Sequence, residues 1–71
     1  MMETFKLDGQ PFIALNNLLK VEGLVESGAM AKQVIAAGMV TVNGEVELRK
    51  RCKIVAGSLV AFNGESVQVC A

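Results

Sequence analysis

The stretch from Ser27 to Lys53 most restricts the folds that are open to this chain. It reads SGAMAKQVIAAGMVTVNGEVELRKRCK. A serine side chain can accept hydrogen bonds from the free amides that begin a helix, and Gly38 can supply the left-handed residue that ends one. Asn43-Gly44, between apolar residues, is a strong signal for a β-hairpin. A capped helix followed directly by a hairpin predicts an α+β fold.

The helix in this stretch is expected to run from Ser27 to about Ala37. Its buried stripe should contain the apolar residues at helical spacing, which are Met30, Ala31, Val34 and Ile35. The opposite side carries small or polar residues: Gly28, Ala29, Lys32, Gln33 and Ala36. The alanines on that side are explained by helix propensity alone, or by a surface kept low so that a bulky partner can approach.

The hairpin could form in two registers. A two-residue loop would place Val42 opposite Glu45 on one face, which mixes an apolar with a charged side chain. A three-residue loop with Gly44 in a left-handed bulge would instead pair Val40 with Val46. We expect the three-residue loop.

The rest of the chain supplies support for this stretch. The expected elements are a strand at Thr4–Leu7, a helix at Phe12–Lys20, and strands at Leu59–Phe62 and Ser66–Val69. Pro11 suits the first position of the helix, and Gly23 suits its end. The three phenylalanines, Phe5, Phe12 and Phe62, are expected in the core. No linker divides the 71 residues, of which 52% are hydrophobic, so residues 1–71 are expected to form one domain.

The residue types needed for catalysis are missing. The chain has no histidine, which is the usual base near neutral pH, and its carboxylates are scattered singly. It has no glycine-rich phosphate loop. Its two cysteines are too few and too far apart for a structural zinc site. We therefore predict a protein that is not an enzyme and has no metal or cofactor.

The cysteines and the N-terminus indicate the compartment. No apolar run approaches the roughly 18 residues of a membrane-spanning helix, and the N-terminal MMETFKLD does not resemble a secretory signal. A cytoplasmic protein with free thiols is the simplest expectation. Cys52 stands between Arg51 and Lys53, which would favour its thiolate and hence its redox sensitivity if it were exposed.

Positive charge is concentrated although the formal net charge is zero. A sequence pI of about 6.2 is low for a nucleic-acid binder. However, four of the seven cations fall within five positions, namely Arg49, Lys50, Arg51 and Lys53. Such a run is either a solvated loop or a binding site, in which arginine would grip phosphate with two donors and lysine as a point charge. Lys32, on the smooth side of the helix, favours the binding site.

The order of residues in this region resembles that of a known family. The pattern consists of Ser27, Ala31, Ile35, Gly38, Val40, Val42, Asn43 and Gly44. It resembles the S4 RNA-binding domain, also called the alpha-L motif, over about residues 12–62. The segments LLKVEG, ESGAMAK and VELRKRCKIVAG are most similar to the small stand-alone bacterial S4-like proteins of the YbcJ type.

The resemblance implies a fold and a set of contacts. In the family, two helices pack on a small, bent, mostly antiparallel sheet, and RNA lies across the second helix and the hairpin. The implied RNA contacts are Ser27, Gly28, Lys32, Gln33 and Asn43, with phosphate contacts from Arg49, Lys50, Arg51 and Lys53. Many members have an arginine directly after the capping serine, where this chain has Gly28, so one expected cation is missing.

Two functions fit these features. The first is binding of structured RNA, ribosomal or other non-coding, through shape and phosphate contacts, because A-form RNA hides the base edges of its deep major groove. The second is a protein-interaction module in which the smooth helix face and the basic loop dock an acidic partner. For either function we expect a monomer.

Overall fold

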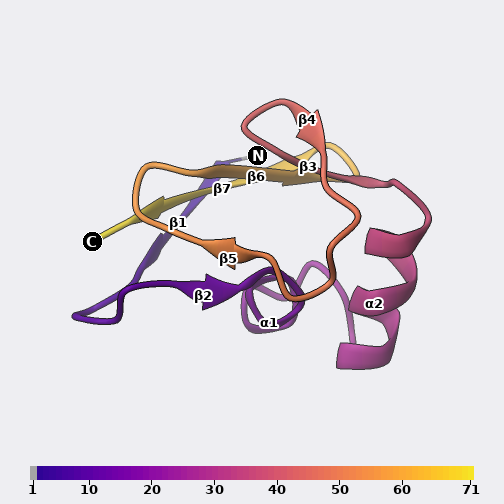
Figure 1. The fold of residues 1–71 in the computed structure, drawn as a ribbon, viewed down its shortest axis with the longest axis horizontal. Coiled ribbons are helices and arrows are strands. Elements are labelled where there is room, and N and C mark those ends of the chain that lie inside the picture. Colours follow the sequence, from indigo (N-terminus) through magenta and orange to yellow (C-terminus); the bar gives the residue numbers. More distant parts are fainter. Residues whose placement is uncertain (1) are drawn as a thin grey trace.

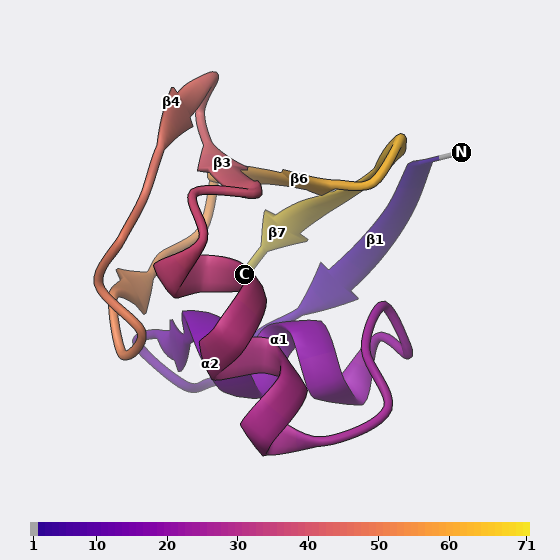
Figure 2. The same ribbon diagram turned by 90° about the vertical axis from the view of Figure 1, so that its right-hand side faces the viewer.

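The computed structural model describes residues 2–71, which form two helices and seven short strands (Figure 1). Their bounds in chain order are β1 Met2–Lys6, β2 Ile13–Ala14, α1 Leu15–Val21, α2 Gly28–Ala36, β3 Val40–Val42, β4 Glu45–Val46, β5 Lys53–Ile54, β6 Leu59–Phe62 and β7 Glu65–Cys70. Both helices lie on one face of the main sheet, as the perpendicular view in Figure 2 also shows. The predicted α+β architecture is confirmed.

The main sheet has five strands in the order β1-β7-β6-β3-β4, and a second sheet consists of β2 and β5. All neighbouring strands run antiparallel except β1 and β7, which are parallel. The sheet is therefore mostly antiparallel, as expected. The first strand begins two residues before its predicted start, and β6 has the predicted bounds.

The loop of the β3–β4 hairpin has two residues, so the predicted register is wrong. Thr41 is opposite Val46, whereas we had expected Val40 in that place. The loop residues Asn43 and Gly44 have φ angles of 53° and 86°. Two consecutive positive φ angles are the requirement of a type I′ turn, whose twist matches that of the flanking strands.

The predicted register is wrong because only the edge of β3 that faces β6 belongs to the core. The matching of apolar with apolar side chains therefore does not apply to β4. On the edge that faces β6, Val40 is paired with Phe62, and both side chains are buried. The Asn43 amide donates to the Leu59 carbonyl at 2.8 Å, and the Leu59 amide donates to Asn43 Oδ1 at 2.9 Å. By contrast, both residues of β4 are exposed. Glu45 in β4 is therefore exposed to solvent, and its charge does not disfavour the observed register.

The helix α1 begins later than the predicted Phe12–Lys20. It spans Leu15–Val21, and the two preceding residues form β2, which pairs with β5. Pro11 is therefore outside the helix. The predicted end is confirmed, because Gly23 has a φ of 73° and its amide donates to the Lys20 carbonyl at 3.1 Å.

The helix α2 matches its prediction closely. Ser27 Oγ accepts a hydrogen bond from the Met30 amide at 3.1 Å, which satisfies one of the free amides at the helix start. Gly38, with a φ of 77°, ends the helix, and its amide donates to the Ile35 carbonyl at 3.0 Å. The buried stripe is narrower than expected, because Met30 is 40% exposed and only Ala31, Val34 and Ile35 are buried.

The core lies between the helices and the main sheet. Its fully buried large side chains are Leu15, Leu18, Leu19, Ile35, Val40, Ile54, Val60, Val67 and Val69. Phe62 is also buried, and Phe5 packs against the core, as predicted. Within residues 2–71, no helix is long and apolar enough to cross a membrane.

The left-handed position after α2 predicts an effect on stability. A Cβ at Gly38 would lie 3.7 Å from Val46 Cγ1 and 3.9 Å from Leu48 Cδ2, which are ordinary contacts. The penalty of Gly38→Ala therefore comes from the backbone alone, and we expect a loss of about 1–2 kcal/mol in the free energy of unfolding, measured in urea. Gly28→Ala is the control, because Gly28 lies in α2 with open space around it. Equal effects of the two substitutions would contradict this account.

Candidate nucleic-acid interface

The basic loop, residues 49–52, is fixed to the start of α1 by backbone hydrogen bonds. The N-cap residue of α1 is Ala14, which offers no side-chain acceptor. Instead, the Leu15 amide donates to the Cys52 carbonyl at 2.9 Å, and the Asn16 amide donates to the Lys50 carbonyl at 3.0 Å. The first amides of any helix lack intrahelical partners, so this loop takes the place of a cap.

The end of the basic loop is anchored in the core. Cys52 is half-buried and packs against the core, and Ile54 in β5 is buried and paired with Ile13. Between them, Lys53 is exposed. The alternation of buried and exposed residues thus turns the cations outward while the backbone is held.

Glu47 forms an ion pair with Arg49 that was not predicted from the sequence. Arg49 Nε is 2.9 Å from Glu47 Oε2, and Arg49 Nη2 is 3.1 Å from Glu47 Oε1. The Arg49 amide also donates to Glu47 Oε2 at 3.0 Å. The Arg49 side chain remains 76% exposed, whereas that of Glu47 is 18% exposed. The only available signal was a carboxylate two residues before the first arginine.

This pair shifts the pKa values of the groups around it. The side-chain hydrogen bonds from Arg49, followed by the one from its amide, lower the pKa of Glu47 from 4.5 to about 2. The same contact with Glu47 raises the pKa of Arg49. Burial first, and then the Glu47 carboxylate, raises the pKa of the Cys52 thiol. A Cys52 thiolate was expected only for an exposed residue. Cys52 is half-buried, and its burial and the Glu47 carboxylate outweigh the effect of Arg49 on its pKa.

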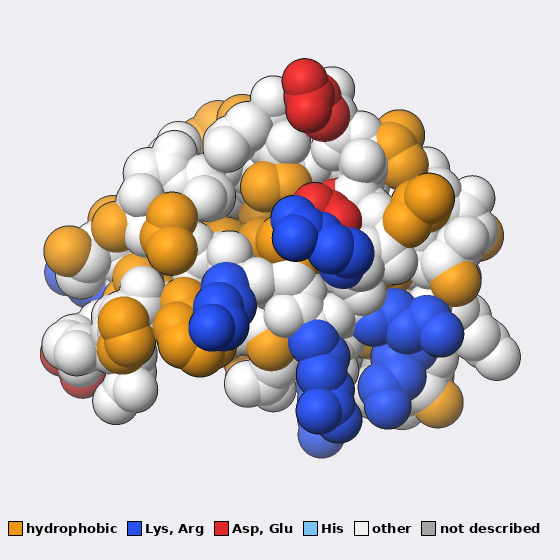
Figure 3. Space-filling model, viewed as in Figure 1, with side chains coloured by type: hydrophobic (Ala, Val, Ile, Leu, Met, Phe, Trp, Pro, Cys, Tyr) orange, Lys and Arg blue, Asp and Glu red, His pale blue; other side chains and the backbone are white. Residues whose placement is uncertain are grey.

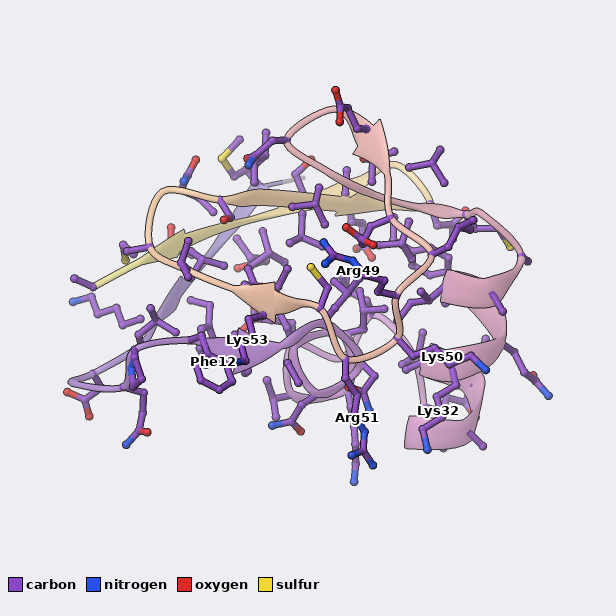
Figure 4. All side chains as sticks on the ribbon, viewed as in Figure 1. Phe12, Lys32, Arg49, Lys50, Arg51 and Lys53 are labelled. Carbon is purple, nitrogen blue, oxygen red and sulfur yellow. The ribbon has the colours of Figure 1, made fainter. Side chains whose placement is uncertain are left out.

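The remaining cations of this region gather on one face. Figure 3 shows lysine and arginine side chains across this face, and Figure 4 labels Lys32, Lys50, Arg51 and Lys53 in the same view. All four are exposed, and in the part of the chain that the structure describes only Arg49 has an ion pair. Arg49, Arg51, Cys52 and Lys53 line an open cavity of about 390 Å³. The arrangement concentrates positive charge on one face.

The other residues with expected RNA contacts have different surroundings. The oxygens of Ser27 and Asn43 are engaged in structural hydrogen bonds, to Met30 and Leu59 respectively. Gln33 is exposed on α2, and Gly28 has no atom within 4 Å of where its Cβ would be. In Figure 1 the hairpin is at the top and α2 begins near the bottom. The β3–β4 hairpin and the start of α2 thus lie at opposite ends of this view.

No cluster of three or more histidine, cysteine, aspartate or glutamate residues suitable for a metal ion occurs within residues 2–71. Both cysteines are free.

The lowered pKa of Glu47 predicts how stability depends on pH. The group releases its proton more readily in the folded than in the unfolded chain, so its stabilising contribution is present above pH 4.5 and is lost as the pH falls toward 2. Glu47→Gln should therefore lower the melting temperature at pH 7, and the difference from the wild type should vanish near pH 2. Circular dichroism melting curves at pH 7, 4 and 2 measure this.

The control for this prediction is Glu45→Gln. Glu45 is exposed in β4 and has no ion pair within the described part of the chain. Glu45→Gln should leave the dependence of the melting temperature on pH the same as in the wild type. A difference between Glu47→Gln and the wild type that persists unchanged at pH 2 would mean that the Glu47 carboxylate is not its source.

Comparison with known proteins places this chain in a family. The S4 domain model matches residues 5–70. Over 70 residues, the chain is 60% identical to the Escherichia coli (strain K12) protein named "Putative RNA-binding protein YbcJ", covering 99% of this chain and 100% of that protein. The Shigella flexneri protein named "Uncharacterized protein YbcJ" matches with the same identity and coverage.

A solved structure agrees with the fold. The solution structure of YbcJ from E. coli, described as revealing an alfaL motif involved in RNA-binding, superposes with a TM-score of 0.77 at 59% identity. The match covers 100% of this chain and 90% of that chain. The predicted alpha-L fold is thereby confirmed, and the chain belongs to the S4 domain family.

Proposed function

We propose that this chain binds structured RNA as a single S4 domain over residues 1–71, without catalysing a reaction. The observation that carries the proposal is a group of four exposed cations on one face that have no ion pair within residues 2–71, namely Lys32, Lys50, Arg51 and Lys53. The relative from E. coli, whose name describes RNA binding, is 60% identical over its full length. Both the face and the relative support the same function.

The rigid backbone beneath the cations favours a structured RNA. The hydrogen bonds from Leu15 and Asn16 fix the loop before any ligand arrives, so less conformational entropy is lost on binding. A fixed set of positive charges matches phosphates whose spacing is itself fixed, as in an A-form stem. Recognition of such stems depends on shape and on contacts to phosphates and 2′-hydroxyls.

Arg49 has a weaker part in this proposal than its neighbours. Part of its guanidinium donates to Glu47, and Nη2 also donates to Cys52 Sγ at 3.4 Å. A guanidinium has five N–H donors, so its other side can still reach a phosphate. However, the adjacent carboxylate repels that phosphate. We therefore assign most of the attraction to Lys50 and Arg51 within the loop, and to Lys32 and Lys53 beside it.

The salt dependence of binding tests this assignment. If about four phosphates are contacted, the affinity of the wild type for an RNA hairpin should fall roughly a hundredfold between 50 and 200 mM salt. The double variant Lys50→Ala/Arg51→Ala should lower the slope of log affinity against log salt by about 1.4–1.8, because each lost contact removes about 0.7–0.9. Fluorescence anisotropy with a labelled hairpin measures both quantities.

Lys6→Ala is the control for the double variant. Lys6 ends β1, at the edge of the main sheet opposite to β4. Lys6→Ala removes one positive charge, whereas the double variant removes two. Lys6→Ala should leave the slope unchanged. Binding by the wild type that does not respond to salt, or equal slopes for Lys6→Ala and the double variant, would refute the phosphate contacts.

Gly28 offers a test in the opposite direction. The S4 pattern has an arginine at this place in many members, and here a side chain would extend into open space at the start of α2. Gly28→Arg should therefore strengthen binding to the same hairpin and increase the salt slope by about 0.7–0.9, the value for one added contact. Gly28→Gln is the uncharged control and should not change the slope. An arginine that acts no differently from glutamine would show that RNA does not approach this end of α2.

A further inference from the structure

Phe12 lies on the basic face and not in the core, so its predicted position is wrong. Its side chain is 39% exposed, and Lys53 Nζ is 5.0 Å from the centroid of its ring. The late start of α1 explains the error, because Phe12 precedes β2 and is not part of the helical stripe. Figure 4 shows Lys53 and Phe12 together at one end of the row of cations. A cation over an aromatic ring is a favourable contact, and Phe12 still contributes to the exposed surface.

Phe12 borders a cavity of about 280 Å³ between the end of β1, β2 and the start of α1. Its lining consists of Phe5, Leu7, Gln10, Phe12, Ile13, Ala14 and Asn17. The walls are aromatic and aliphatic, and the only polar side chains are two amides. Pockets for drug-sized ligands measure about 300–1,000 Å³. The cavity is therefore suited to one flat heterocycle and not to a larger molecule.

The two amides at this cavity are free to bind a ligand. Gln10 and Asn17 are both exposed, and neither side chain has a hydrogen bond within residues 2–71. A carboxamide presents a donor and an acceptor side by side, which matches the edge of an adenine. No charged residue lines the cavity, so a carboxylate or a free phosphate would find no partner inside it.

Lys53 connects this cavity with the basic surface. It lines the basic cavity together with Arg49 and Arg51, and its ammonium group lies over the ring that borders the apolar cavity. A nucleotide has its phosphate and its base at opposite ends of a ribose. Its phosphate could therefore be bound by Lys53 while its base enters the apolar cavity and stacks against Phe12.

We propose that this cavity binds one unpaired nucleobase, best an adenine, of an RNA whose stem lies on the basic face. The inference rests on the proposed function and narrows its ligand to an RNA stem with an adjoining unpaired nucleotide. Phosphate contacts position a protein on a nucleic acid, whereas base contacts supply specificity. Phe12 would provide the stacking surface, and the amides of Gln10 and Asn17 would read the base edge.

Two RNA hairpins test this inference. They share one stem, and one of them carries a single unpaired adenosine, replaced by fluorescent 2-aminopurine in a second preparation. We expect the wild type to bind the hairpin with the unpaired adenosine at least about fivefold more tightly, since stacking on an aromatic side chain contributes this much or more per base. The 2-aminopurine fluorescence should decrease on binding, as it does when this base stacks.

Variants assign the preference to the cavity. Phe12→Leu keeps an apolar side chain but removes the ring, so it should abolish the preference for the hairpin with the unpaired adenosine. A third hairpin has the same stem and carries an unpaired uridine in place of the adenosine. Gln10→Ala/Asn17→Ala should reduce the preference for the adenosine hairpin over this uridine hairpin. Val55→Ala is the control, because Val55 is an exposed apolar residue outside the lining. Circular dichroism confirms that each variant is folded.

The outcomes separate the inference from the proposed function. Equal affinity of the wild type for both hairpins would overturn the base site while leaving the phosphate-binding face intact. If Phe12→Leu keeps the preference for the hairpin with the unpaired adenosine, and Gln10→Ala/Asn17→Ala keeps the preference for adenosine over uridine, the unpaired base binds elsewhere. That result would also overturn the base site. Failure to bind either hairpin would overturn the proposed function and the base site together.

Discussion

Two backbone hydrogen bonds between α1 and the basic loop determine both the fold of this region and the position of its charges. The amides of Leu15 and Asn16 have no side-chain cap nearby, and they are satisfied by carbonyls more than thirty positions later in the chain. Buried amides without partners destabilise a fold, so the loop is required for α1 to begin where it does. In return, α1 holds the loop with its side chains outward. The same bonds that complete the helix therefore present the cations.

A dense group of cations on such a loop would repel itself without compensation. Glu47 reduces this repulsion by pairing with Arg49, and its low pKa keeps it ionised near neutral pH. The pair also orients the start of the loop, because the Arg49 amide donates to the same carboxylate. Arg49 thus stabilises the loop that presents Lys50 and Arg51. A protein with no net charge can in this way display a strongly positive surface.

The features that sequence reasoning identified correctly depend on neighbouring residues. The cap at Ser27, the stop at Gly38 and the turn at Asn43-Gly44 all follow from interactions over a few positions. The error in the register of the β3–β4 hairpin is local, because Asn43-Gly44 itself favours the two-residue turn that forms. The error at α1 concerns a partner that is distant in sequence. The loop after β4 sets the start of α1, so this start could not be derived from local periodicity. The cluster of basic residues was evident, but Glu47 and the exposed ring of Phe12 emerged only from the three-dimensional arrangement.

The error at Phe12 has the largest consequence for function. As a core residue, it would leave the face with cations alone, which attract any phosphate backbone without discrimination. On the surface, it adds an aromatic ring beside Lys53, at the border of a second cavity. The side-chain amides of Gln10 and Asn17 at this cavity have no hydrogen-bond partner within residues 2–71. A neutral protein exerts little long-range attraction on RNA, so its selectivity has to come from close contacts. The point where the basic and apolar cavities meet is where such contacts are available.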